Sequence, residues 1–303
     1  MVPSAQAPAA VEGQAAVEAK EWHFSRHGRR LAVLEWGPED GIPLVALHGW
    51  LDNAESFSLL ATLLPELRII ALDFAGHGFS DHLGGGQSYY SWDHAADVYA
   101  LLEELKLKEV ALLGHSLGAG VATLLAGAFP RRISQLFLID GLVPLTYPLA
   151  DLPQCMATAL RRNTRLSTRL SGRSLKPYSS FAEAVAARVN SRWPVSESAA
   201  IKLLARGLKQ SELGWVWRAD MALTQPSLVR LCEAQLRAFV QQLSMPVLLV
   251  MAEDGEEWAP ITPLLDQVPD LTLHTLAGSH HLHLEAQPAK LIAAWMRQRL
   301  TAG

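Results

Sequence analysis

The segment Gly114-His115-Ser116-Leu117-Gly118 constrains the fold of this chain more than any other part of the sequence. The apolar run Val110–Leu113 before it predicts a buried strand, and Ala119–Phe129, which Pro130 ends, predicts a helix. A strand that turns directly into a helix must bend sharply, and glycines on both sides remove side chains that would collide there. The pattern therefore predicts a serine hydroxyl exposed at a helix N-terminus, where backbone N–H groups favour developing negative charge.

Strand-like and helix-like segments alternate over most of the chain. The predicted strands are Glu21–Arg26, Leu31–Trp36, Pro43–Leu47, Arg68–Asp73, Glu109–Leu113, Gln135–Asp140, Pro246–Ala252 and Leu271–Thr275. The remaining predicted helices lie near Ala54–Leu64, Ser91–Leu105, Pro260–Val268 and Pro288–Leu300. This alternation predicts an α/β protein with a mostly parallel sheet and helices on both faces, and the first two strands form an antiparallel hairpin at one edge.

The alternation stops between Leu142 and Leu243, where the sequence shows no convincing strand alternation and we expect an inserted helical cap. Helical patterns cover Met156–Leu170, Phe181–Val189 and Ser198–Gln210. Most of the cap aromatics are expected to form its own core, and one or two to face a pocket; they are Tyr178, Phe181, Trp193, Trp215 and Trp217. The expected division is a flexible leader over 1–20, a core over 21–141 and 244–303, and a cap over 142–243.

Composition narrows the class of protein. The formal net charge is −4, which gives no indication of a nucleic-acid partner. The two cysteines, Cys155 and Cys232, form no disulfide framework and no metal-ligand spacing, which favours a reduced compartment. Residues 1–20 lack the basic and apolar regions of a secretory signal, and we find no run long enough to span a membrane. We therefore expect a cytoplasmic protein without stable membrane insertion.

A serine hydroxyl needs a base to become a nucleophile, and the loop Gly278–Glu285 offers three histidines. Metal binding by His280, His281 and His283 is an alternative, but no further ligands are evident in the sequence, so we predict no metal site. His280 follows the small pair Gly278-Ser279 and is the preferred base, with His281 as the alternative. His283 is expected to support the loop by hydrogen bonding.

Two backbone N–H groups are needed to bind an oxyanion, and we expect them from Leu117 and Trp50. Two aspartates compete to orient His280. Asp140 ends the sixth strand and Asp254 follows the seventh, so both lie at the carboxyl edge of the sheet, where sites of open α/β sheets form. Either one can instead be structural, capping a helix or a turn.

Four motifs together resemble the α/β-hydrolase superfamily, in order and from Glu21 onward: His48-Gly49-Trp50, Asp73–Ser80, Gly114–Gly118 and Gly278–Glu285. More narrowly, His48–Asn53, Leu138–Gly141 and Gly278–His283 resemble the serine hydrolase-like subgroup. Dehalogenase and epoxide-hydrolase relatives carry an aspartate where this chain has Ser116. Members that use a seventh-strand acid usually show Gly-x-x-Asp, and here Gly255 takes the place of that aspartate with Asp254 one residue early. The resemblance therefore favours Asp140.

Together these observations predict a capped, cofactor-independent serine hydrolase of carboxylic esters or related acyl compounds, acting on a small-molecule substrate. Thioesters, lactones and carbon–carbon bonds are also compatible with this scaffold. The alternatives are a cofactor-free oxygenase or C–C hydrolase that uses the same residues, and a non-catalytic protein that binds a ligand under the cap.

Overall fold

The computed structural model describes residues 18–84, 87–169, 177–253, 255 and 258–301, so most of the predicted leader lies outside the described residues. Within them one sheet has eight strands, in the order β1-β2-β4-β3-β5-β6-β9-β10. The strands are β1 (Lys20–Arg26), β2 (Arg29–Trp36), β3 (Ile42–Leu47), β4 (Leu67–Leu72), β5 (Val110–His115), β6 (Ile133–Ile139), β9 (Val247–Ala252) and β10 (Leu271–Leu276). The predicted α/β class is confirmed.

Pairing in the sheet follows the sequence pattern. β1 pairs with β2, and β2 with β4, in antiparallel register, whereas the other neighbours are parallel. Gly28, at φ 75°, makes the turn of the predicted edge hairpin. The interior strands β5 and β9 are buried along their whole length, because helices cover both faces of the sheet. The carboxyl ends of the six parallel strands β4, β3, β5, β6, β9 and β10 consequently meet along one edge.

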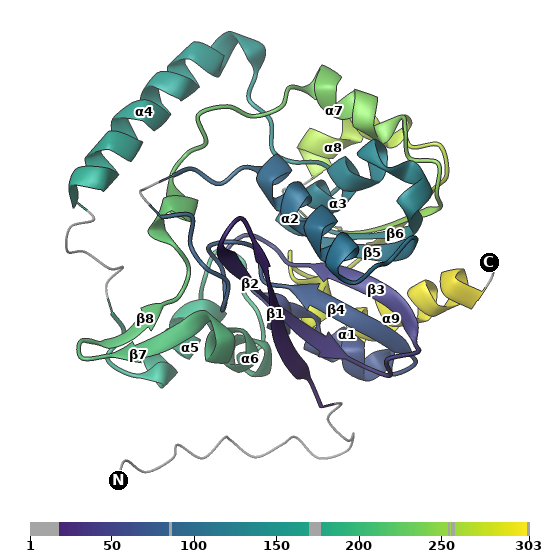
Figure 1. Ribbon diagram of the computed structural model, residues 1–303, viewed down its shortest axis with the longest axis horizontal. Coiled ribbons are helices and arrows are strands. Elements are labelled where there is room, and N and C mark those ends of the chain that lie inside the picture. The colour runs from purple at the N-terminus through teal and green to yellow at the C-terminus, as the bar shows by residue number, and fades with distance from the viewer. Residues whose placement is uncertain (1–17, 85–86, 170–176, 254, 256–257, 302–303) are drawn as a thin grey trace.

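The helices form two layers (Figure 1). One face carries α2 (Ser91–Glu104), α3 (Leu117–Ala128), α7 (Glu233–Val240) and α8 (Trp258–Leu265), whose buried side chains belong to one apolar cluster. The other carries α1 (Ser58–Leu63), the preceding 3₁₀ turn Ala54–Phe57 and α9 (Ala286–Thr301). The buried residues of α9 follow helical spacing, so a single stripe of this helix faces the sheet. They are Ala289, Ile292, Ala293 and Met296.

The segment between β6 and β9 contains α4 (Leu152–Arg169), α5 (Phe181–Val189) and α6 (Glu197–Gly207). α5 and α6 share an apolar cluster of their own, which includes Ala200, Leu203 and Leu204. α7 lies inside the predicted cap range, yet Leu236 and Val240 belong to the core cluster beneath α3. In Figure 1, α4 lies at the periphery, and α5 and α6 lie together at the end of the sheet where β7 and β8 are drawn.

The segment expected to be helical also contains a short hairpin. α6 ends at Gly207, and Leu208–Ser211 (β7) pairs in antiparallel register with Gly214–Trp217 (β8). The predicted helix Ser198–Gln210 therefore runs three residues too far. Gly214, at φ 115°, supplies the backbone conformation that the tight turn needs, and Trp215-Val216-Trp217 favours a strand. Strands of four residues are too short to show a convincing alternation.

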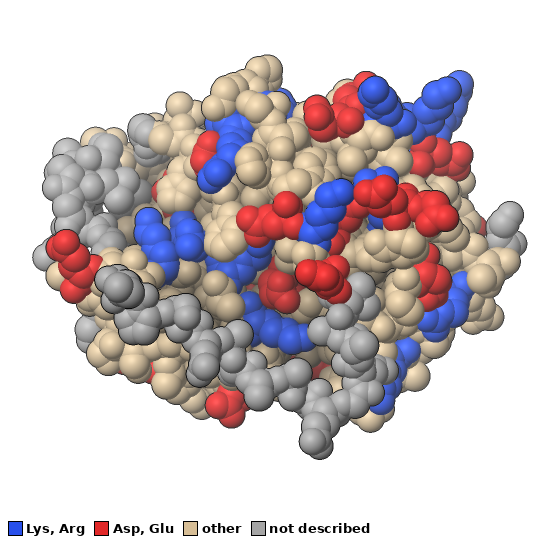
Figure 2. Space-filling view, turned by 60° about the horizontal axis from the view of Figure 1, so that its bottom comes forward, with Lys and Arg blue, Asp and Glu red and all other residues tan. Residues whose placement is uncertain are grey.

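Within the described residues, no helix combines the length and apolar character that a membrane crossing requires. On the face shown in Figure 2, Lys and Arg side chains are interspersed with Asp and Glu side chains. That face does not display one continuous basic surface of the kind that binds nucleic acid.

Candidate active site

Ser116 occupies the turn between β5 and α3, with φ 52° and ψ −114°. A non-glycine residue rarely adopts a positive φ, so the surrounding structure has to hold it there. The Ser116 N–H donates to the Ile139 carbonyl at 3.0 Å, and the Ser116 carbonyl accepts from Gly120 N–H at 3.1 Å. A Cβ at Gly118 would overlap the carbonyl oxygen of Leu47, so α3 can lie this close to β3 only with glycine there.

His280 and Asp140 come together from loops that follow two different strands. His280 lies after β10, and its Nδ1–H donates to Asp140 Oδ2 at 2.6 Å. Asp140 directly follows β6, is buried, and accepts the Ala252 N–H on Oδ1 at 2.8 Å. Because Nδ1 faces the carboxylate, Nε2 of His280 is the ring nitrogen left to receive a proton. Among the described interactions there is no hydrogen bond between Ser116 Oγ and the His280 ring.

The competing aspartate, Asp254, lies outside the described residues. Its neighbour Gly255 is described, and a Cβ there would lie 3.2 Å from Asp140 Oδ1. A side chain at position 255 would therefore press against the Asp140 carboxylate.

The two predicted oxyanion donors lie just after the neighbouring strands β3 and β5. Leu117 is the first residue of α3, where backbone N–H groups have no partner within the helix. Trp50 follows β3, which pairs with β5 so that Leu47 lies opposite Gly114. Trp50 is 43% exposed, and its Nε1–H donates to the Leu223 carbonyl at 2.9 Å. This bond ties the loop after β3 to the segment between β6 and β9.

Four histidine rings pack together behind the serine. The ring centroid of His115 lies 4.7 Å from that of His280, 5.0 Å from that of His281 and 4.4 Å from that of His283. His283 Nε2 forms a 2.7 Å hydrogen bond with Ser56 Oγ, and burial lowers the pKa of His283 to about 3. A neutral, buried and hydrogen-bonded His283 fits the supporting role expected from the sequence.

Sequence reasoning missed Asp52 and Arg188. The Asp52 carboxylate lies 3.0 Å from His281 Nε2 and 3.4 Å from Arg188 Nη2. Burial alone would raise the pKa of Asp52, but His281 and Arg188 outweigh it and hold that pKa well below its usual range. Asp52 belongs to the His48–Asn53 motif, which was the available signal. Arg188 comes from α5, and its position in the sequence gives no indication of this contact.

The segment between β6 and β9 also covers the loop of His280. The Trp193 ring lies 5.4 Å from that of His280, and Ser279 Oγ–H donates to the Pro194 carbonyl at 3.1 Å. The other predicted aromatics, Tyr178, Phe181, Trp215 and Trp217, pack against the α5–α6 cluster. Of the five, Trp193 is therefore the one placed at the candidate site.

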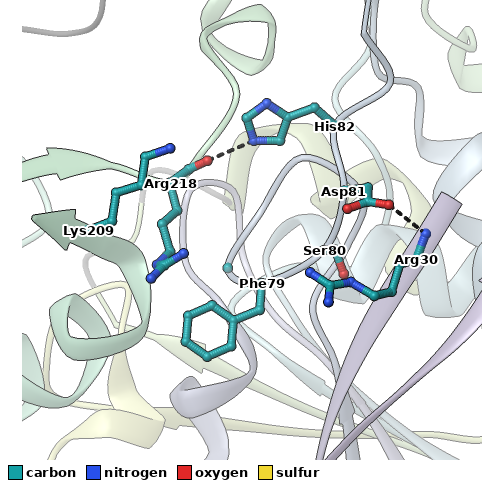
Figure 3. A pocket seen from close by; sticks show the side chains of 8 residues that line it. Arg30, Phe79, Ser80, Asp81, His82, Lys209 and Arg218 are labelled. Atoms are coloured by element: carbon teal, nitrogen blue, oxygen red, sulfur yellow. Dashed lines mark hydrogen bonds between the residues drawn. The ribbon is translucent and has the colours of Figure 1, made fainter. Parts of the chain in front are cut away.

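A hollow of about 260 Å³ lies elsewhere, between β2, the loop after β4 and the β7–β8 hairpin (Figure 3). Arg30, Lys209 and Arg218 give it three cations, against the single carboxylate of Asp81. His82 Nε2–H donates to the Arg218 carbonyl at 2.8 Å across its rim. Ser116, Asp140 and His280 do not line this hollow, so it is not where we place the reaction.

Comparison with known proteins decides the family. Residues 42–286 match the family described as alpha/beta hydrolase fold. The chain belongs to this family. It is 30% identical to a serine hydrolase-like protein of Dictyostelium discoideum, over 85% of this chain and 75% of that protein. It is 28% identical to a serine hydrolase-like protein of Danio rerio, over 82% of this α/β-hydrolase and 79% of the relative.

Solved structures with the α/β-hydrolase fold superpose on this chain. A hypothetical protein of Pseudomonas aeruginosa PAO1 superposes with a TM-score of 0.86 at 43% identity, covering 93% of this chain and 99% of its own. A thioesterase domain from the curacin biosynthetic pathway reaches a TM-score of 0.79 at 22% identity, over 92% of this chain and 99% of that domain. At that identity the second likeness shows the fold alone.

Proposed function

We propose that this α/β-hydrolase is a serine hydrolase of carboxylic esters or related acyl compounds, working through an acyl-enzyme. One observation carries the proposal: Ser116 stands on a left-handed strand-to-helix turn, at the sheet edge where His280 Nδ1 lies 2.6 Å from the buried Asp140 carboxylate. A serine, a histidine and an oriented carboxylate are the groups that nucleophilic acyl transfer requires. Relatives named as serine hydrolase-like support the same class.

Each group has a defined task in this mechanism. Ser116 Oγ attacks the acyl carbon while His280 Nε2 takes its proton and later gives it to the leaving alcohol. Asp140 holds the His280 ring with Nε2 toward the serine and stabilises the imidazolium. The N–H groups of Leu117 and Trp50 bind the oxyanion, and water then hydrolyses the acyl-enzyme.

The proposal does not specify the acyl group or the leaving group of the substrate. A thioester differs from an ester at the leaving atom and uses the same three groups, so both belong to the proposal. The segment between β6 and β9 is proposed as a cap that shapes the acyl pocket, because Trp193 packs on the ring of His280.

An activity-based fluorophosphonate label tests the nucleophile. The wild-type protein should be labelled on one serine and should hydrolyse members of a chromogenic ester series of graded acyl length. Ser116→Ala should abolish labelling and lower turnover by several orders of magnitude. Ser198→Ala, on the exposed surface of α6, serves as the matched control and should change neither. Labelling that persists in Ser116→Ala would overturn the assignment.

Two further measurements separate the alternatives. Oxygen uptake on a heteroaromatic substrate, without ester turnover, would favour a cofactor-free oxygenase on the same residues. Tight ligand binding without turnover or labelling would favour a non-catalytic binding protein. A chelator should leave turnover unchanged, because no step in the proposed mechanism uses a metal ion.

A further inference from the structure

The buried group Asp52, His115 and His281 has donor atoms aimed at one another beside the candidate site. Each residue offers one oxygen or nitrogen, and the three atoms lie within 4.8 Å of one another. His281 Nε2 is 3.0 Å and His115 Nδ1 is 3.9 Å from Asp52 Oδ2. In a tetrahedral zinc site with bonds of about 2.0–2.1 Å, two donor atoms lie roughly 3.3 Å apart, so the two measured separations bracket the required one.

The hydrogen bonding of His115 exposes a lone pair toward this group. The carbonyl of His280 can only accept, so the 2.9 Å contact places the proton on His115 Nε2. His115 Nδ1 is therefore an unprotonated donor atom, and it is buried without a hydrogen-bond partner among the described residues.

Two further features suit a metal ion. A histidine that binds a metal almost always donates its other N–H to a carboxylate or a backbone carbonyl, as His115 does here. Gly49 borders the same gap: a Cβ there would lie 2.8 Å from His115 Nδ1 and 3.2 Å from Asp52 Oδ2. Glycine at position 49 thus leaves the space between the donor atoms free of a side chain.

We propose that Asp52, His115 and His281 bind one divalent transition-metal ion, with Zn²⁺ as the test ion, and that its binding inhibits the enzyme. Imidazole and carboxylate donors together suit Zn²⁺, and a water molecule completes the tetrahedron. Inhibition rests on the proposed function and follows from position. An ion would draw His115 Nδ1 closer to Asp52 Oδ2 than the present 3.9 Å. Because His115 Nε2–H is bonded to the His280 carbonyl, this movement shifts the backbone that holds the base against Asp140.

Arg188 gives the proposal a directional test. Its Nη2 lies 3.0 Å from His281 Nε2 and 3.4 Å from Asp52 Oδ1, so the guanidinium competes with a metal ion for the same two groups. Removing this charge should tighten metal binding, whereas removing a donor should weaken it. If the cluster had only a structural role, removing Arg188 and removing a donor residue would not change the metal affinity in opposite directions.

The experiment is calorimetric titration of the full chain with Zn²⁺ at pH 7.5, with fluorophosphonate labelling of Ser116 in parallel. The wild type should bind one Zn²⁺ and lose labelling as the site fills, with recovery on adding EDTA. Loss of an outer-shell partner typically costs 10–100-fold in metal affinity, so Asp52→Asn and His281→Gln should each weaken binding at least tenfold. Arg188→Met should tighten it. His283→Gln is the matched control, a buried histidine of the same loop outside the donor group, and should bind like the wild type.

Calorimetry measures metal binding whether or not the protein hydrolyses a substrate. The metal site can therefore be tested even if the proposed function is wrong. Circular dichroism identifies variants that do not fold, and Arg188→Met still tests the proposal if both donor variants are lost. Equal affinity in the wild type, Asp52→Asn and His281→Gln would assign the ion to other histidines and overturn the proposal. Binding weakened by Arg188→Met would do the same.

Discussion

At the scale of single residues, the partner of His280 is set by three short hydrogen bonds around Asp140. The carboxylate receives His280 Nδ1–H on one oxygen and Ala252 N–H on the other, and the Asp140 N–H donates to the Val250 carbonyl at 2.8 Å. Side chain and backbone are thus fixed by β9 and the His280 loop together. The catalytic role of the pair stays a prediction, and substitution tests it.

Asp140→Asn should lower kcat, on the order of 10⁴-fold as in the best-studied serine protease triad, with KM nearly unchanged. Asparagine keeps the shape of the side chain but can hold the ring in the wrong tautomer. Asp254→Asn is the comparison and should have a small effect. Steady-state kinetics on one ester decides between them, and the reverse ranking would transfer the role to Asp254.

At the scale of elements, contacts reach from the segment between β6 and β9 to the loop of His280. Trp193 packs on its ring, Ser279 donates to the Pro194 carbonyl, and Ser196 N–H donates to Glu285 at 2.8 Å. Sequence reasoning assigned all five aromatics of this segment as a group, because spacing cannot say which ring leaves the local core. Tertiary contacts single out Trp193.

Trp193→Ala should shift the preferred acyl length in the ester series, because it opens the wall beside His280, while the melting temperature changes little. Trp215→Ala is the matched substitution inside the α5–α6 cluster. It should lower stability, by less than the roughly 3–5 kcal/mol of a fully buried tryptophan, and leave the preference unchanged. Identical acyl profiles for Trp193→Ala and the wild type would show that this wall does not select the substrate.

At the scale of the whole molecule, how well the sequence predicted an element depended on length and burial. β3 and β9 begin within a residue of their predicted starts, because the last four residues of β3 and all of β9 are buried and read as continuous apolar runs. The hairpin β7–β8 was missed because four-residue strands carry too little pattern. Asp52 and Arg188 were missed for another reason: 136 positions separate them, and only the packed fold brings them together.

The buried histidines predict that the molecule loses stability in mild acid. Burial lowers the pKa of His94 and of His283 to about 3, and it also lowers the pKa of His77 and of His115. The unfolded chain binds protons below about pH 6.5, whereas the folded chain does not until the lower pKa is reached. The free energy of unfolding should therefore fall as the pH drops from 6.5 toward 3, by about 1.4 kcal/mol per pH unit for each of His94 and His283.

Urea unfolding at pH 7.5, 6.0 and 5.0 measures this slope. His94→Phe is the informative variant, because the His94 ring packs among aromatic rings, 4.6 Å from Phe74 and 6.1 Å from Tyr89. The substitution should flatten the slope by about 1.4 kcal/mol per pH unit. An unchanged slope would mean that His94 is not a neutral group in the folded chain.

The crowding between Gly255 and Asp140 has an evolutionary consequence. A Cβ at 255 would lie 3.2 Å from Asp140 Oδ1, so a side chain there requires the carboxylate to give way by a few tenths of an ångström. Such a shift disturbs the carboxylate that holds the His280 ring. Relatives that keep an aspartate at 140 should therefore keep glycine at 255, and relatives with an acid at 255 should lack the one at 140.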